Sequence, residues 1–315
     1  MAKSLPPTAE PSGTQVLRLA PTPPDHRVRW IVSVLMAVLV LGWAFSGARF
    51  QPRELYEGRA AILDMFQRMM PPDFSQVTSI AAYNFPPEIG ATDTLIPVPL
   101  SPGLSEVRHR WWENTFPQTI VGGTIQTIQI ALAGTFLALV MAFPLSFLAA
   151  RNTTPHQGVY LAVRSVLNFL RSIPDLALGL MFISAVGLGA FAGTLAVTVS
   201  TTTILAKLIS EKIEGIDGGV VEALQTTGAN HAQVLMWAVV PQILPDIVGL
   251  FLYRFESNIR AAAVLGLIGA GGIGQLMNNA FRQFQYREAA AIVLVLIVLV
   301  MTVDFFSARV RKLTI

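Results

Sequence analysis

Residues 211–274 read EKIEGIDGGVVEALQTTGANHAQVLMWAVVPQILPDIVGLFLYRFESNIRAAAVLGLIGAGGIG. The first part of this stretch, residues 211–240, is comparatively polar and rich in small residues, and long apolar runs flank it. A segment this short cannot bury enough apolar surface to build a core of its own. We therefore expect residues 211–240 to form a helical hairpin at a membrane face, where another protein grips it.

The composition of the chain excludes an ordinary water-soluble globule. Of its 315 residues, 53% are hydrophobic and only 13% are charged, whereas average soluble domains carry about 25% charged residues. Too little polar surface remains to cover a globule in water, so the chain is predicted to be an all-α, polytopic membrane protein. It has no cysteine, which excludes disulfides, thiolate metal sites and catalytic thiols.

The N-terminal region divides into a tail and a first span. Residues 1–24 are rich in Pro, Ser, Thr and Ala and are expected to be a disordered cytoplasmic tail. Residues 30–48 form an apolar run long enough to cross about 30 Å of hydrocarbon, which predicts a first transmembrane helix over 25–48. A cleaved signal peptide is the alternative. It is disfavoured because the run exceeds the roughly 7–15 residues of a signal core and more spans follow.

Residues 49–118 form a long polar section and are expected to lie outside the membrane. Apolar residues recur at helical spacing over 55–70, before Pro71-Pro72, which predicts an amphipathic helix along the membrane interface. The rest of this external segment is rich in Pro and Asn and shows no helical period.

Five more apolar runs follow the first, which predicts about six transmembrane helices. They lie at residues 119–150, 159–186, 190–210, 243–268 and 289–307. The run at 119–150 is longer than a simple crossing needs, and we expect it to start as an interfacial helix. Residues 119–310 then form the transmembrane core, with the loop at 211–240.

Basic residues near the span ends predict the orientation in the cell membrane, since cytoplasmic loops carry an excess of Lys and Arg. A multi-pass arrangement with both termini in the cytoplasm collects these on one side: Arg27, Arg29, Arg151, Lys207, Lys212, Arg309, Arg311 and Lys312. The arginines of 49–118 oppose this arrangement, but long loops translocate largely regardless of their charge. The same orientation puts residues 211–240 in the cytoplasm.

A resemblance to a known family lies in this cytoplasmic loop. Glu222-Ala223-Leu224, then Gly228, and after nine residues Ala238-Val239-Val240-Pro241 resemble the EAA loop of ABC-importer permeases. The family pattern is E-A-A, three residues, G, nine residues and I-x-L-P, from which Leu224, Ala238 and Val240 depart. The resemblance implies a short coupling helix that docks on an ATPase subunit through Glu222, Ala223, Leu224, Gly228 and Pro241.

Further motifs, in the same order, are similar to the phosphonate-type permeases. They are TFLALVMAFPLSFLAARN (135–152), RSIPD (171–175), GLGAFAG (187–193), KLISE (207–211), NIRAA (258–262) and GAGGIG (269–274). This resemblance implies a type I ABC importer permease fold over about residues 119–310. It also implies a membrane subunit that imports phosphonate, phosphite or phosphate. A methionine-type or other importer permease is the runner-up.

The resemblance also implies the partners. They are a second permease copy in a homodimer, two ATPase subunits that carry ATP and Mg²⁺, and an external substrate-binding protein. The chain itself is expected to be no enzyme, to hold no cofactor or metal, and to contact the lipid bilayer but no nucleic acid.

Four glycines near the end of the fifth span, Gly269, Gly271, Gly272 and Gly274, need a separate interpretation. Three of them fit G-x-G-x-x-G, the dinucleotide fingerprint, which requires a preceding strand and a later acidic residue. Here a membrane span precedes the glycines. We interpret them as sites of close helix packing or as a gate, because glycine removes side-chain bulk and allows positive φ.

Ionisable groups at membrane depth are costly, so they face a cavity or a partner. The candidates are Arg171, Asp175, Arg254, Glu256, Asn258 and Arg260, with Asn258 as their neutral neighbour. Two acid–base pairs are spaced i,i+4, which favours intrahelical ion pairs. The other interpretation is that some arginines line the path and attract an oxyanion, whose oxygens suit guanidinium donors.

Three other classes of protein fit less well. A secondary transporter would need discontinuous helices and coupling carboxylates near the midplane, for which Glu256 is the main candidate. An intramembrane enzyme would need a nucleophile or a metal cluster, and the histidines are scattered without metal-ligand spacing: His26, His109, His156 and His231. A structural scaffold would leave the spacing from Glu222 to Pro241 unexplained.

Overall fold

The computed structural model describes residues 26–48 and 52–314, so the predicted tail at 1–24 lies outside the described part of the chain. The chain divides into two units, residues 1–63 and 64–315. Every regular element among the described residues is helical, which confirms the predicted all-α class.

The first unit holds α1 (His26–Gly47), α2 (Pro52–Glu57) and the start of α3 (Arg59–Met69). Residues Trp30–Gly47 of α1 have a mean hydropathy of 2.0 over 18 residues, which is long and apolar enough to cross a membrane. The amphipathic stretch predicted over 55–70 falls in two helices, since α2 ends at Glu57 and α3 begins two residues later.

The second unit begins with short helices that an aromatic cluster holds together. They are α4 (Ser75–Thr78), η1 (Ile80–Tyr83), α5 (Ala91–Leu95), α6 (Pro102–Arg110), η2 (Trp111–Thr115) and η3 (Phe116–Gln118). Trp111 is buried, stacks on Phe85 and donates its indole N–H to the Tyr83 carbonyl at 2.9 Å. This long-range packing orders a segment in which the sequence shows no helical period.

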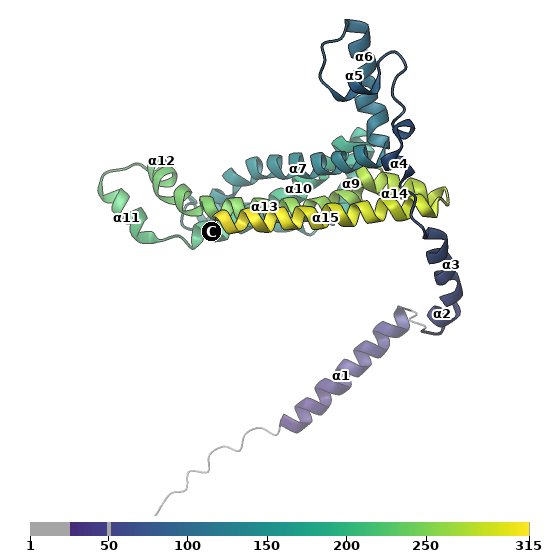
Figure 1. Cartoon of the computed structure of the whole chain (residues 1–315). Coiled ribbons are helices and arrows are strands. Elements are labelled where there is room, and N and C mark those ends of the chain that lie inside the picture. The colour runs from purple at the N-terminus through teal and green to yellow at the C-terminus, as the bar shows by residue number, and fades with distance from the viewer. Residues whose placement is uncertain (1–25, 49–51, 315) are drawn as a thin grey trace, which may run out of the picture. The chain divides into compact units, whose positions relative to one another are not determined.

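A helical bundle forms the rest of the second unit (Figure 1). Its elements are α7 (Ile120–Ala149), α8 (Gln157–Arg171), α9 (Asp175–Val186), α10 (Ala190–Glu214), α11 (Gly218–Thr226), α12 (His231–Val234), η4 (Leu235–Val239), α13 (Val240–Gly266), α14 (Gly272–Arg282) and α15 (Tyr286–Thr314). Figure 1 shows α11 and α12 at one end of this bundle and α14 at the other. We name these the α11 end and the α14 end.

Small residues let α7 and α10 lie close together at the centre of the bundle. A Cβ added to Gly134 of α7 would approach Val197 of α10 to 2.7 Å. Farther along the same pair of helices, Ala138, Ala142 and Ala206 are fully buried in one apolar cluster. In lipid, helices associate through such close packing rather than through the hydrophobic effect.

Five stretches are long and apolar enough to cross a membrane, and a sixth is added if α8 and α9 count as one broken span. This agrees with the prediction of about six spans. Two details differ from it. Residues 120–149 form one continuous helix rather than an interfacial helix followed by a span. The run at 159–186 is not a straight span, because α8 and α9 meet at 87°.

The α8–α9 bend follows from the sequence Ser172-Ile173-Pro174. Proline disfavours the helical conformation in the residue before it and cannot donate to the preceding turn, so α8 ends at Arg171 and α9 starts after Pro174. The bend therefore brings the two ionisable residues Arg171 and Asp175 to a break in the helix.

The glycines at the α14 end serve two structural purposes. Gly269, Gly271 and Gly272 have φ of 101°, 81° and 72°, a region that favours glycine, and they make the turn from α13 into α14. Gly274 permits close approach instead, because a Cβ there would lie 1.8 Å from the Ala263 carbonyl oxygen of α13.

Gly274→Ala should therefore separate α13 from α14. We expect the variant to lose about 1–3 kcal/mol of unfolding free energy, the usual cost of overpacking. Thermal unfolding of the detergent-solubilised protein measures the loss. The matched control is Gly249→Ala in the middle of α13, where an added Cβ meets nothing within 4 Å. Equal melting temperatures for the two variants would contradict this account of the packing.

Candidate functional site

One face of α10 carries polar side chains from Ser200 to the end of the helix. Ser200, Thr203, Lys207, Ser210 and Glu214 follow each other at three- and four-residue spacing, which places them on one side of a helix. Their contacts identify that side. Ser200 bonds to α9, Glu214 bonds to α8, and the three residues between them line a cavity together with α8. This polar face of α10 forms one side of the candidate site.

A buried polar network lies beside it, between α7, α10 and α13. Arg254 is only 9% exposed, and its Nη2 donates to Thr201 Oγ1 and to Asn258 Oδ1, both at 3.2 Å. Asn258 in turn donates from Nδ2 to Thr135 Oγ1 at 2.7 Å. The hydrogen-bond acceptors are thus neutral, and Arg254 Nε has no partner among the described residues. A charge this poorly compensated is costly at membrane depth.

Asp175 is the acidic group near this arginine. It accepts a hydrogen bond from Ser200 Oγ at 2.5 Å, and it attracts Arg254 electrostatically, while Arg171 repels Arg254. Arg171 and Asp175 form no ion pair within 4 Å in the described structure, although they are spaced i,i+4. The i,i+4 rule fails here because the chain leaves the helix between them.

Glu256 and Arg260 belong to a different cluster, on the face of α13 that meets α15. Arg260 Nη2 lies 3.2 Å from Glu256 Oε1, which is the intrahelical pair that the spacing favours. Two residues of α15 complete the cluster: Arg311 lies 3.4 Å from Glu256, and Asp304 lies 3.4 Å from Arg260. The six candidate residues therefore separate into a group around Arg254 and an ion-pair cluster around Glu256.

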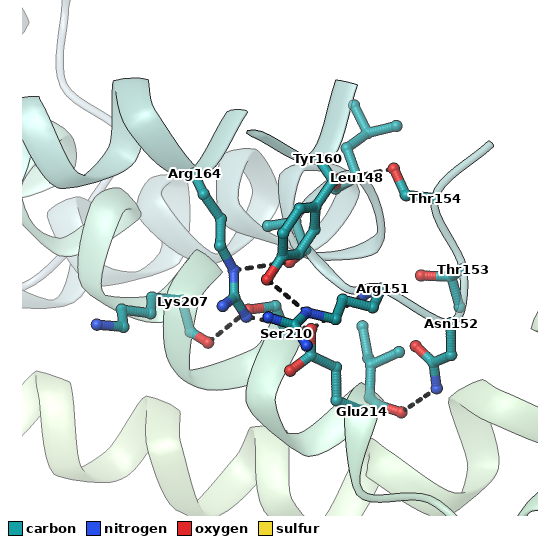
Figure 2. Close-up of polar contacts among 12 residues, drawn as sticks. Leu148, Arg151, Asn152, Thr153, Thr154, Tyr160, Arg164, Lys207, Ser210 and Glu214 are labelled. Carbon is teal, nitrogen blue, oxygen red and sulfur yellow. Dashed lines mark hydrogen bonds and ion pairs between the residues drawn. The ribbon is translucent and has the colours of Figure 1, made fainter. Parts of the chain in front are cut away.

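A second polar cluster anchors the start of α8 toward the α11 end (Figure 2). Arg164 Nη2 lies 3.2 Å from Glu214 Oε1, and its guanidinium sits 4.8 Å from the ring centre of Tyr160. Arg151 donates from Nε to the Tyr160 hydroxyl at 2.9 Å, and this hydrogen bond raises the pKa of Arg151. These contacts tie α8 to the last turn of α10.

A larger cavity of about 720 Å³ opens at the α14 end. Its polar lining consists mainly of side-chain amides, with Gly271 and Gly272 at its wall and Glu113 and Glu288 as its acids. No lysine or arginine is among the described residues that line it. The amide groups are Gln76, Asn114, Gln118, Gln126, Gln275, Asn279, Gln283 and Gln285.

Three of the predicted coupling residues, Glu222, Ala223 and Leu224, lie in α11, which has no buried residue. Gly228 follows α11, and Pro241 lies in the first turn of α13. Glu222, Ala223, Gly228 and Pro241 are exposed, and Leu224 is half-buried. Gly228 has φ of +82°, which ends the turn after α11. The loop is joined to the bundle by a hydrogen bond from the Asp217 N–H to Gln242 Oε1 at 3.0 Å and by Val221 against the core. α11 is thus exposed on the single chain and is attached to the bundle at its start.

Sequence reasoning did not single out three residues of the site: Thr135, Ser200 and Thr201. The sequence does show hydroxyl side chains within apolar spans. Five of them lie close together in α10, namely Thr198 and the run from Ser200 to Thr203. Hydroxyls in a span can bond their own helix, as Thr202 does to the Thr198 carbonyl at 2.7 Å. That possibility hides which of them face a partner. Among the described residues, no group of three or more His, Asp or Glu could hold a metal ion.

Comparison with known proteins links this arrangement to transport. Residues 142–314 match the family described as binding-protein-dependent transport system inner membrane component. The phosphite transport system permease protein PtxC of Stutzerimonas stutzeri is 44% identical over 188 residues, which cover 60% of this chain and 68% of that protein. The phosphate-import permease protein PhnE of Mycolicibacterium smegmatis is 32% identical over 277 residues, 88% of this chain but 44% of that protein.

A solved structure shows the same fold. The inward-facing MetNI methionine ABC transporter superposes with a TM-score of 0.56 at 20% identity, over 69% of this chain and 100% of that one. The predicted permease fold is confirmed by this likeness.

Thr135→Val tests the buried network, because it keeps the side-chain shape and removes the acceptor for Asn258 Nδ2. We expect a loss of about 1–3 kcal/mol, the cost of leaving a buried donor unsatisfied. Chemical unfolding in detergent micelles measures it. Thr302→Val on the exposed face of α15, where the hydroxyl bonds only its own helix, is the control and should be near neutral. The network is not important for stability if the two variants unfold alike.

Proposed function

The chain belongs to the family of binding-protein-dependent transport system inner membrane components, and we propose that it is the membrane subunit of an ATP-driven importer for phosphorus oxyanions. Phosphonate, phosphite and phosphate are the expected substrates. The 44% identity to a permease named for phosphite supports this class. The likeness to the methionine transporter concerns the fold alone and carries no argument about substrate.

The observation that supports the proposal best is the state of Arg254. A buried guanidinium whose hydrogen-bond acceptors are neutral keeps its positive field available to an anion. Guanidinium groups match the oxygens of phosphorus oxyanions in geometry and charge. Asp175 attracts the same guanidinium and so competes with a passing anion. This competition keeps the affinity low, as transport requires, because a tightly held solute would not leave.

We infer that a second copy of the chain completes the path. Arg171 and Asp175 are exposed on the single chain, and they lie among exposed apolar side chains of α8 and α9. Lipid would make the exposure of both charges costly, so this surface requires protein or water opposite it. A homodimer that meets along α8 and α9 supplies both. The exposed apolar residues are Leu161, Val166, Phe169, Leu176, Leu180 and Met181.

The ion-pair cluster of Glu256 and Arg260 has a structural role in this proposal. Its charges already satisfy one another between α13 and α15. The path residues are therefore Arg171, Asp175, Arg254 and Asn258. Gly271 and Gly272 border the amide-lined cavity, and Gly269 and Gly274 serve as turn and packing residues beside them.

The open face of α11 is the proposed contact with the ATPase subunits, which carry ATP and Mg²⁺. With both termini in the cytoplasm, as the basic residues near the span ends predict, the α11 end faces the cytoplasm and the α14 end faces the external substrate-binding protein. Closure of the ATPase pair would move α11 as a rigid body and shift the bundle between inward-open and outward-open states. The loaded binding protein must favour one of these states for coupling to occur.

Uptake tests the substrate class and the role of Arg254 together. Cells that lack other uptake systems receive the permease, its ATPase and its binding protein, and accumulation of phosphite, methylphosphonate, phosphate and methionine is measured. The wild type should accumulate at least one phosphorus oxyanion and no methionine, and Arg254→Gln should lower the rate at least tenfold. Arg260→Gln, on the other face of α13, should stay within about twofold. Methionine uptake by the wild type would overturn the proposal.

Gly228→Val tests the coupling helix. A β-branched residue at φ of +82° is strained by roughly 1–2 kcal/mol, so the turn after α11 should rearrange and the ATPase should detach. Copurification of the ATPase with the permease measures attachment. Gly218→Ala, at the start of α11, is the control because an added Cβ there meets nothing within 4 Å. Undiminished attachment in Gly228→Val would refute the coupling role.

A further inference from the structure

A small cavity of about 60 Å³ lies between α8 and α10, on the α11 side of Arg254. Three cationic side chains line it: Arg164 and Arg171 from α8, and Lys207 from α10. Asn168, Thr203 and Ser210 add an amide and two hydroxyls to the wall. Figure 2 shows Arg164, Lys207 and Ser210 in this region of the bundle.

The positive charges of this cavity are only partly neutralised. Glu214 lies 3.2 Å from Arg164 and is its carboxylate partner. Within the described structure, no carboxylate lies within 4 Å of Arg171 or Lys207. Asp175 and Glu211, each four residues farther along the sequence, also lie beyond this distance. Three cations and one carboxylate therefore leave two positive charges without a counter-charge. Lys207 is half-buried, so water screens it incompletely.

The size and the donors of the cavity define what would neutralise it. One water molecule needs about 10–15 Å³ of cavity volume. The cavity therefore has room for a few water-sized groups, such as the oxygens of one tetrahedral oxyanion. It is too small for a nucleotide. Guanidinium, ammonium and amide groups are all hydrogen-bond donors toward an anionic oxygen. A compact anion with several oxygens and up to two negative charges fits this set.

We propose that this cavity binds a phosphate-type group between Arg171 and Lys207. The group can come from two sources: the transported oxyanion, a source that rests on the function proposed above, or the headgroup of an anionic lipid. For the transported anion, the site is the next position after Arg254. Lys207 lies seven residues beyond Ser200 on α10, which is about 10 Å at 1.5 Å per residue. Arg171, beside the bend, belongs to both positions.

Binding to the full-length chain in nanodiscs tests the site without transport. Inorganic phosphate is titrated in phosphatidylcholine nanodiscs and followed by phosphorus NMR, and lipids retained from phosphatidylglycerol nanodiscs are identified by native mass spectrometry. Lys207→Gln and Arg171→Gln should each lower the affinity for the bound species at least tenfold, which is the effect of losing a charge-assisted hydrogen bond. Lys207→Arg keeps the charge and should bind within about threefold of the wild type.

Lys212→Gln is the matched control on the same helix, since Lys212 pairs with Asp246 at 2.9 Å and does not line the cavity. Phosphate binding in neutral lipid that is lost in the two variants identifies the free oxyanion as ligand. Phosphatidylglycerol retention that is lost in them identifies the lipid. The site is refuted if the two variants and Lys212→Gln bind both probes as the wild type does, or if neither probe binds. Wild-type uptake of oxyanions with no binding here would leave the proposed function intact.

Discussion

A charge inside a membrane must be compensated, and this constraint organises the bundle. Arg254 donates to Thr201 and Asn258, and Asn258 donates to Thr135, so the network joins three helices. The close approach of α7 and α10 through small residues brings short side chains from both helices within hydrogen-bonding distance of α13. The network is neutral apart from the arginine, so its charge is positioned but not cancelled. An anion path needs that combination.

The same helices connect this charge to the proposed coupling face. α10 carries Ser200, which bonds Asp175 near Arg254, and ends at Glu214, which bonds Arg164 of α8. α13 carries Arg254 in its middle and Gln242 in its first turn, and Gln242 accepts from the Asp217 N–H before α11. In our proposal, a rigid displacement of α11 therefore acts on α10, which contacts Asp175 through Ser200, and on α13, which carries Arg254. Hydrogen-bonded side chains and rigid helices of this kind carry energetic coupling between distant sites.

Much of this could be predicted from the sequence, because span length and the α11 motif are local features. The residues of α11, the apolar runs and the Glu256–Arg260 pair needed only short-range spacing. The rest depends on tertiary packing. The bend at Pro174 was hidden in an apolar run and removed the expected Arg171–Asp175 pair. The second cation on Glu256 is Arg311, 55 residues away, and the aromatic cluster around Trp111 joins segments 28 residues apart. No periodicity reports such contacts.

The central claim is that the α8–α9 bend faces an aqueous path within the bilayer, and the absence of native cysteine allows a direct test. The assembled importer with Ser172→Cys is treated with a charged, membrane-impermeant thiol reagent, beside Met301→Cys on the exposed apolar face of α15. The account predicts rapid modification at position 172, slowed by the transported oxyanion, and none at position 301. Equal inertness at both positions would contradict it, because the bend would then face lipid.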